Sequence, residues 1–393
     1  MQSVSQNPTD PAFVQNPYPF YSRVRATGDL FFWRNYDKVA AVSHAAVHGL
    51  LRDRRFGREC PPELNVELPP HLADWLRVER HSLLEAEPPR HTRLRSLVLR
   101  AFTSRAITAL APGIETLCHQ LIDVFPDGPF DLLGAYCTPV PVITICRLLG
   151  VPEDMSPSLL RWSHDMVAMY QAVRDSATEE TANRSSAEFT RFLRGYIDRR
   201  RSDPRDDLIT RLIAAEEEGE RLSTDELIAT CILVLNAGHE ATVHGIGNGV
   251  KTLLETRAPH SALAAVAIDD TVEELLRFDP PLHMFTRYAY EEVDIFGHRF
   301  RRGDQVALLL GAANRDPAIW AAPDEFDPTR KVRPNTAFGG GLHFCVGAPL
   351  ARLEMRIALS VLFKRCPDLR LTQPPDYSDT YHFHGLSQLI VSR

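Results

Sequence analysis

One long helical segment constrains this chain more than any other feature. Ser223 and Glu226 form the Ser-x-x-Glu pattern of a capping box at its start. The helical period then continues to about Thr256, and Pro259 stands beyond it as a stop. At 1.5 Å per residue, such a helix spans roughly 45–50 Å. A globular domain that contains it must be built around it.

The segments on either side of this helix predict the rest of the architecture. A short helix is expected at about Ala12–Thr27, followed by a strand at Leu30–Trp33. From about Pro88 onward the helical period dominates, with breaks near residues 126, 150–152 and 203–204. After Pro280 the pattern changes to short strands, loops and one last helix that begins near Gly347. We therefore expect a mainly α protein with a smaller β region, a single domain (1–393) built around the long central helix.

Composition excludes several classes of protein. The chain is 44% hydrophobic and 24% charged, as globular proteins are. Its longest apolar run is too short to cross a bilayer, and no signal peptide is visible at the N-terminus. We expect a cytoplasmic protein that does not use a membrane. The net charge of −7 gives no support to nucleic acid as a partner.

The seven cysteines are scattered and form no Cys-x-x-Cys pair. This spacing supports neither a zinc ribbon nor a thioredoxin-type redox pair. Six of them are expected to be small buried hydrophobic residues. Cys345 differs because of the residues around it.

Cys345 follows a glycine-rich loop and precedes a helix. The loop contains Gly339–Gly341, whose lack of a Cβ lets the backbone approach a flat ligand closely. An apolar helix is predicted from Ala348, with Pro349 in its first turn. A helix N-terminus favours an anion, so the sulfur is expected to be a thiolate, the form that binds metal. A cysteine nucleophile paired with His343 is the alternative, which a two-residue offset does not favour.

This segment resembles the haem-binding signature of the cytochrome P-450 superfamily, F-G-x-G-x-H-x-C-x-G. Every fixed position is present from Phe338 to Gly347, and the resemblance extends over nearly the whole chain. It implies the cytochrome P-450 fold and haem b (iron protoporphyrin IX) as cofactor. It also implies that Cys345 is the axial iron ligand, with Phe338 and Gly347 beside the haem. A thiolate ligand pushes electron density onto the iron and favours O–O cleavage.

The resemblance also implies residues that bind the haem propionates. His91 and Arg95 are four residues apart and share a helical face. They match the family's H-x-x-x-R pattern, and Arg287 and His343 match two further propionate partners. Arginine suits such sites because its planar fork can bind a carboxylate through two hydrogen bonds.

An ion network is expected to support the haem side without taking part in catalysis. Glu274 and Arg277 lie three residues apart on one helical face. Taken alone, such a pair is usually a solvated surface ion pair. Its position between the long helix and the cysteine loop matches the family's E-x-x-R motif, and Arg330 matches the second arginine of that network.

The long helix carries the residues expected on the distal side of the haem. Ala237 and Gly238 stand where the family leaves room for dioxygen, although a tight helix–helix crossing would also explain the glycine. Glu240 matches the acid of the family's acid–alcohol pair, which helps to deliver protons. The alcohol position is Ala241, and a hydroxyl appears only at Thr242. One residue turns a helical side chain by about 100°, so Thr242 cannot simply take over the role.

Substrate and electron donor are less constrained. The resemblance suggests Asn236, Leu282, Met284 and Phe383 as pocket residues. It also suggests that the segments around 60–84 and 162–173 gate access. No flavin, nicotinamide or iron–sulfur module is fused to the chain, so a separate ferredoxin-type donor and its reductase are expected.

These features predict a haem-thiolate monooxygenase that uses dioxygen to hydroxylate a small organic substrate. An alternative keeps the haem but performs oxidative coupling, desaturation or peroxide-driven oxidation, which Ala241 leaves open. A non-catalytic haem-binding sensor is a third class. The acid at Glu240 and the lid-like segments speak against a sensor.

Overall fold

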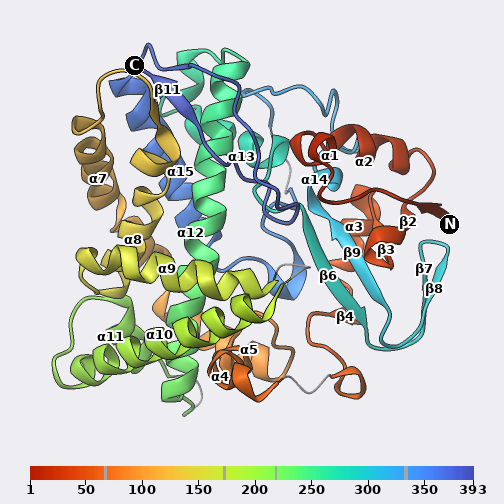
Figure 1. Cartoon of the computed structure of the whole chain (residues 1–393), viewed down its shortest axis with the longest axis horizontal. Coiled ribbons are helices and arrows are strands. Elements are labelled where there is room, and N and C mark those ends of the chain that lie inside the picture. Colours follow the sequence, from red (N-terminus) through yellow and green to blue (C-terminus); the bar gives the residue numbers. More distant parts are fainter. Residues whose placement is uncertain (66–68, 171–173, 217–218, 332–334) are drawn as a thin grey trace. The chain divides into compact units, whose positions relative to one another are not determined.

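The computed structural model describes residues 1–65, 69–170, 174–216, 219–331 and 335–393 (Figure 1). The chain divides into two compact units. Unit 1 comprises residues 1–64, 115–138 and 241–393, and unit 2 comprises residues 65–114 and 139–240. The predicted mainly α architecture with a smaller β region is confirmed. The expectation of one domain over residues 1–393 stays a prediction.

The long helix α12 (Thr224–Glu255) has the predicted bounds and belongs to both units, changing from one to the other after Glu240. Its capping box is also as predicted. The Ser223 backbone N–H donates to Glu226 Oε2 at 2.8 Å, and the Glu226 N–H donates to Ser223 Oγ at 3.2 Å. Two backbone N–H groups, which would otherwise lack a partner, are thereby satisfied at the helix start.

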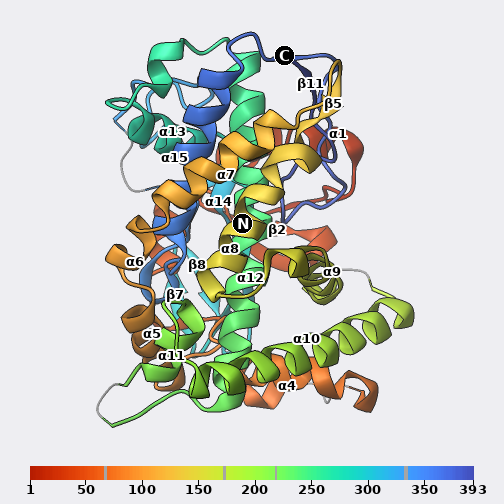
Figure 2. The same cartoon turned by 90° about the vertical axis from the view of Figure 1, so that its left-hand side faces the viewer.

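The named secondary-structure elements that lie wholly within unit 2 are all helices. The helix α10 packs along α9 and α4 (Figure 2). Besides the first part of α12, the helices of the unit are α4 (Ala73–His81), α5 (Arg90–Ala101), α6 (Ser104–Thr108), α8 (Pro139–Leu149), α9 (Ser156–Val167), α10 (Ser176–Ser202) and α11 (Leu208–Ala214).

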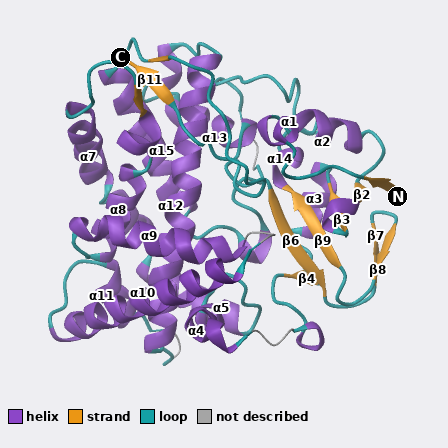
Figure 3. Cartoon of the chain, viewed as in Figure 1, coloured by secondary structure: helices purple, strands orange, loops and turns teal. Residues whose placement is uncertain are grey.

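Unit 1 contains the strands that the structure describes (Figure 3). The largest sheet has the order β1 (Gln2–Val4), β2 (Leu30–Trp33), β3 (Lys38–Ala41), β9 (Gln305–Leu309), β6 (Met284–Ala289), β4 (Phe56–Gly57). Smaller sheets pair β10 (Arg370–Leu371), β11 (Ile390–Ser392) and β5 (Phe130–Asp131), and separately β7 (Val293–Ile295) and β8 (His298–Phe300).

Helices complete unit 1. They include α1 (Pro11–Gln15), α2 (Tyr18–Arg25), α3 (His44–Leu50), most of α7 (Ala111–Asp123), α13 (Ile268–Phe278), α14 (Leu310–Ala313) and α15 (Ala348–Arg365). The prediction of one helix at 12–27 is wrong in one respect, because the segment forms two helices, α1 and α2. Asn16 is extended at the end of α1, and Pro17 follows it. A residue before proline is driven out of the α region by steric clash, which explains the break.

The ion network predicted beside α13 is confirmed. Glu274 and Arg277 are 0% exposed, and Arg277 Nε lies 2.6 Å from Glu274 Oε2. Arg330 Nε donates to Glu274 Oε1 at 3.1 Å. Arg277 also donates to the backbone carbonyls of Asn314 and Pro323. The network thus links α13 to the chain segment that leads toward the cysteine loop.

Candidate functional site

The cysteine loop lies in unit 1 immediately before α15. The Cys345 N–H donates to the Phe338 carbonyl at 3.1 Å, which closes the loop. Gly339 and Gly341 have φ values of +70° and +64°, in the left-handed region that favours glycine. A Cβ on Gly341 would clash with the Leu51 carbonyl oxygen. Both backbone conformation and close packing therefore require glycine at Gly341.

Replacing Gly341 with alanine is expected to destabilise this loop more than its backbone angle alone implies. A matched control is Gly297→Ala, since Gly297 has φ +70° but nothing within 4 Å of its added Cβ. The angle alone should cost roughly 1–2 kcal/mol at either position. Urea unfolding should show a clearly larger loss for Gly341→Ala, because its Cβ meets backbone. Equal losses would mean that the packing against Leu51 is unimportant.

The environment of the seven cysteines separates Cys345 from the rest. Cys345 is exposed, Cys60 is half-buried, and the other five are buried. Burial raises the pKa of Cys118 to about 11 and that of Cys146 and Cys231 to about 12. These buried sulfurs therefore stay protonated at neutral pH. Cys345 stands at a helix start, where a thiolate is favoured.

The side chains near Cys345 fit a flat cofactor that carries acidic groups. Arg287, on β6, is only 2% exposed, and its guanidinium lies 5.8 Å from the ring centre of Phe285, which packs against Gly339 of the cysteine loop. His343 precedes the cysteine by two residues. Phe338 lies under the Arg352 guanidinium, 4.5 Å from the ring centre. Gly347 lies beside the sulfur, since an added Cβ would be 3.7 Å from Cys345 Sγ. An accessible sulfur, a glycine cradle and nearby cations are the donor set that a haem requires.

Unit 2 carries the other two predicted propionate residues. His91 and Arg95 lie on α5 one turn apart, as their spacing predicts. His91 is 1% exposed, whereas Arg95 is half-buried. A buried histidine and a half-buried arginine on one helix face suit carboxylate binding, and their propionate role stays a prediction.

Ala237 and Gly238, in the middle of α12, have different surroundings. Gly238 packs against α8, because an added Cβ would lie 3.1 Å from Ile145 Cδ1. This is the close helix contact that would explain the glycine. Ala237 is exposed, although the residues around it on α12 are buried or half-buried. The small side chain at Ala237 therefore leaves open space at the centre of the helix.

Glu240 has partners that the sequence did not reveal. His164, on α9, places Nε2 2.9 Å from Glu240 Oε1, and His239 Nε2 lies 3.4 Å from the same oxygen. The hydrogen bond that His164 donates to the Glu240 carboxylate raises the pKa of His164. No sequence spacing links α9 to α12, so this partner could not be found without the fold. Next along the helix, Ala241 is half-buried and Thr242 is 4% exposed.

The predicted substrate residues occupy different surroundings. Leu282 and Phe383 form an antiparallel bridge in unit 1. Met284 is 3% exposed in an aromatic core cluster, as a packed core side chain would be. Asn236, in unit 2, lies 4.0 Å from Met166 Sδ through Nδ2, and its buried Oδ1 has no hydrogen-bond partner among the described residues.

Three histidines, His283, His382 and His384, neighbour Leu282 and Phe383 in the sequence, and two of them belong to the core of unit 1. His283 and His384 are 0% and 3% exposed. Burial lowers the pKa of His384 to about 3, and its ring stacks on Tyr377 at 3.8 Å. These rings are neutral packing elements. His382 is half-buried, and burial lowers its pKa to about 4.

The two segments expected to gate access contact each other within unit 2. Tyr170 donates to Glu79 Oε1 at 2.9 Å, and Leu72 and Met169 share a small apolar cluster. Parts of both segments, residues 66–68 and 171–173, lie outside the described residues. Their gating role stays a prediction.

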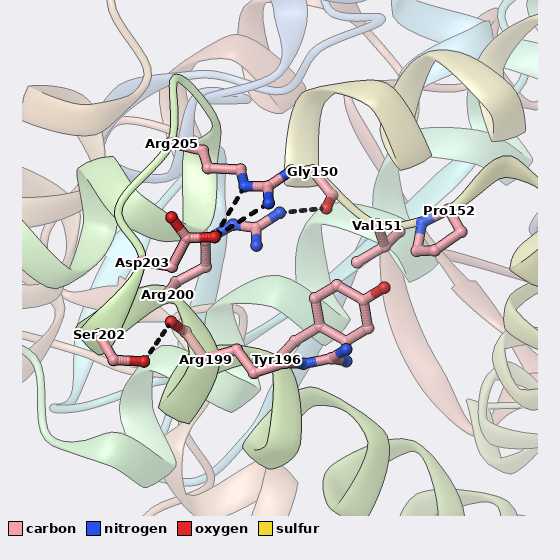
Figure 4. A pocket seen from close by; sticks show the side chains of 9 residues that line it. All are labelled: Gly150, Val151, Pro152, Tyr196, Arg199, Arg200, Ser202, Asp203 and Arg205. Carbon is pink, nitrogen blue, oxygen red and sulfur yellow. Dashed lines mark hydrogen bonds and ion pairs between the residues drawn. The ribbon is translucent and has the colours of Figure 1, made fainter.

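A surface pocket of about 440 Å³ lies in unit 2 apart from these residues (Figure 4). Two of its arginines form ion pairs, Arg200 with Asp207 and Arg205 with Asp203. The guanidinium of Arg199 lies 4.0 Å from the Tyr196 ring centre. Its lining residues are Gly150, Val151, Pro152, Tyr196, Arg199, Arg200, Ser202, Asp203 and Arg205.

Comparison with known proteins agrees with the family resemblance seen in the cysteine loop. The family model for cytochrome P450 matches residues 267–386, which include the loop. The cytochrome P450 monooxygenase PikC of Streptomyces venezuelae is 38% identical over 373 residues, which cover 92% of this chain and 87% of PikC. The vitamin D(3) 25-hydroxylase of Pseudonocardia autotrophica is 36% identical over 97% of this chain and 94% of its own.

The fold agrees as well. The crystal structure of P450BioI in complex with acyl carrier protein that carries hexadec-9Z-enoic acid matches with a TM-score of 0.90 and 33% identity. That match covers 97% of this chain and 99% of P450BioI. No helix among the described residues is long and apolar enough to span a bilayer. The chain therefore belongs to the cytochrome P450 family and is a haem-thiolate monooxygenase.

Proposed function

We propose that Cys345 would hold the haem iron through its sulfur and that the residues of α12 control proton delivery. The observation that carries this is the exposed Cys345 sulfur at a helix start, behind a loop that requires glycine. His91, Arg95, Arg287 and His343 would bind the haem propionates, and Phe338 and Gly347 would contact the macrocycle. When bound, the haem supplies dioxygen activation and the oxidising power for substrate hydroxylation.

Glu240 is the proton donor of this proposal. Its carboxylate holds a hydrogen bond with His164, whose side chain is 54% exposed. Protons from solvent can therefore reach Glu240 through His164. Through His164, Glu240 can regain a proton from solvent after it has donated one. Thr242 does not replace the missing hydroxyl, because it faces about 100° away from the Ala241 direction.

A polar group on the substrate completes the relay at Ala241. The support is Asn236, which lies one turn before Glu240 and has a buried Oδ1 without a partner among the described residues. A buried acceptor without a donor is costly. A hydroxyl on the substrate would satisfy it. We therefore propose a largely apolar substrate that carries at least one hydroxyl, bound near Ala237 with Leu282, Met284 and Phe383 as further contacts.

Restoring threonine at position 241 tests this proposal. On the natural substrate, Ala241→Thr is expected to leave the product formed per reducing equivalent unchanged or lower, because the substrate already supplies the hydroxyl. A substrate analogue without that hydroxyl should couple poorly in the parent enzyme and better in Ala241→Thr. A large gain in coupling on the natural substrate would contradict the relay, and would favour the alternative of a chain adapted to desaturation or oxidative coupling.

The electron donor is a separate protein of the ferredoxin type. The support is that the family usually draws on separate redox partners and that this sequence contains no cysteine run of the plant-ferredoxin type. Reconstitution with a [2Fe–2S] ferredoxin and its reductase should support turnover. A flavodoxin that supported turnover while every ferredoxin failed would overturn this part.

A further inference from the structure

We propose that His164, His239 and Glu240 form a site for a zinc ion. The three side chains all come from unit 2, His164 from α9 and the other two from α12. Their ligand atoms all lie within 4.8 Å of one another. Nε2 of His164 and Nε2 of His239 lie 2.9 and 3.4 Å from the same carboxylate oxygen. Ligands bound to one tetrahedral zinc at about 2.0–2.1 Å lie at similar separations.

His239 is oriented as a metal ligand is. Its Nδ1 lies 2.9 Å from the Leu235 carbonyl one turn earlier on α12. A backbone carbonyl at this distance receives the ring proton, so Nε2 carries the lone pair. The residue is 1% exposed, and apart from the Glu240 oxygen at 3.4 Å this Nε2 has no hydrogen-bond partner among the described residues. Metal-bound histidines commonly make this second hydrogen bond to a carbonyl, which sets their orientation.

The donor set selects the metal. Two imidazole nitrogens with one carboxylate oxygen are typical of zinc sites that keep an open fourth position. Magnesium and calcium prefer oxygen ligands alone, so they do not fit. The side chain of His164 is 54% exposed, which gives an ion a path from solvent and leaves space for water as the fourth ligand.

A second histidine–carboxylate cluster shows why the first is distinctive. Asp279, His283 and His384 also lie close together, in unit 1. There, however, both Asp279 oxygens accept hydrogen bonds from tyrosine hydroxyls, and His283 Nδ1 bonds to Tyr21. All three residues are at most 6% exposed, so an ion has no path to them. That cluster is a closed hydrogen-bond network, whereas the site at His164 is open.

Zinc at this site would control turnover. A bound ion takes the carboxylate of Glu240 and the imidazole of His164, and both are then lost to proton delivery. This consequence rests on the proposed role of Glu240. Binding itself does not, because it depends only on the three ligands. The site would make the enzyme sensitive to free zinc without any change at the haem.

Titration calorimetry of the haem-loaded protein with zinc ions alone tests the site. We expect one equivalent to bind to the parent protein. His164→Gln removes the exposed ligand and should raise the dissociation constant for zinc by at least about 10–100-fold. Loss of an outer-shell partner alone commonly weakens metal affinity by that factor. His239→Gln should weaken it similarly. The matched control is His71→Gln, because His71 also pairs with a glutamate, Glu179, at 2.8 Å in unit 2 but has no third ligand. It should bind zinc as the parent does.

The outcomes distinguish the proposed zinc site from the proposed proton role of Glu240. The reduced carbon-monoxide difference spectrum first establishes that every variant holds its haem. Equal zinc affinity in the parent and in His164→Gln would overturn the site, as would an equal loss in His71→Gln. Zinc that binds as expected and slows product formation supports both proposals. Zinc that binds through these residues but leaves turnover unchanged supports the site and overturns the proton role of Glu240.

Discussion

Replacing Cys345 with serine is expected to abolish monooxygenation and to remove the thiolate signature from the reduced carbon-monoxide difference spectrum. A serine hydroxyl is not ionised near neutral pH, so it cannot push electron density onto the iron as a thiolate does. Because this electron donation favours O–O cleavage, product formation should fall below detection even where some haem is retained. Haem content, the carbon-monoxide spectrum and product yield are the three measurements.

The control for this change is Cys60→Ser, at a half-buried cysteine outside the loop. It should keep both the spectrum and the activity. The five buried cysteines are poorer controls, because a hydroxyl in their apolar surroundings would itself destabilise the fold. A Cys345→Ser protein with an unchanged spectrum would exclude Cys345 as the ligand.

Removing Arg277 is expected to produce the largest loss of stability among the changes considered. Glu274 and Arg277 are both 0% exposed in the parent protein. Arg277→Met therefore leaves Glu274 as a buried carboxylate without its main partner. Two weaker contacts remain to that carboxylate, from Arg330 Nε at 3.1 Å and from the Asp327 backbone N–H at 3.0 Å. Breaking a buried ion pair from one side typically costs about 3–5 kcal/mol. Urea unfolding of the haem-loaded protein should show a loss of this size, together with weaker retention of haem.

An exposed pair in the same unit provides the matched control. Arg299 donates to Asp294 at 2.8 Å, but the two side chains are 62% and 66% exposed. Arg299→Met should therefore change the unfolding midpoint little, because water and salt already screen that pair. If Arg277→Met and Arg299→Met lowered stability equally, the ion network at Glu274 would not be the support that we infer.

The local elements were predictable because their signals lie close together in the sequence. The capping box at Ser223 and the stop before Pro259 gave α12 to within a residue or two. The helix after Gly347 followed from Pro349 and the apolar run. The error at Asn16–Pro17 has the same origin, since the apolar period ran through a proline that interrupts the helix.

The sequence by itself determined the cysteine loop, since glycine spacing, cysteine and helix start are neighbours along the chain. It also showed that Ala241 stands where a hydroxyl is expected. Only the tertiary structure decided which side chains meet Glu240, because His164 comes from α9, far away in sequence. It likewise decided that Gly238 packs on Ile145 while Ala237 stays exposed. Contacts between distant segments depend on how helices pack, and no spacing along one helix contains that information.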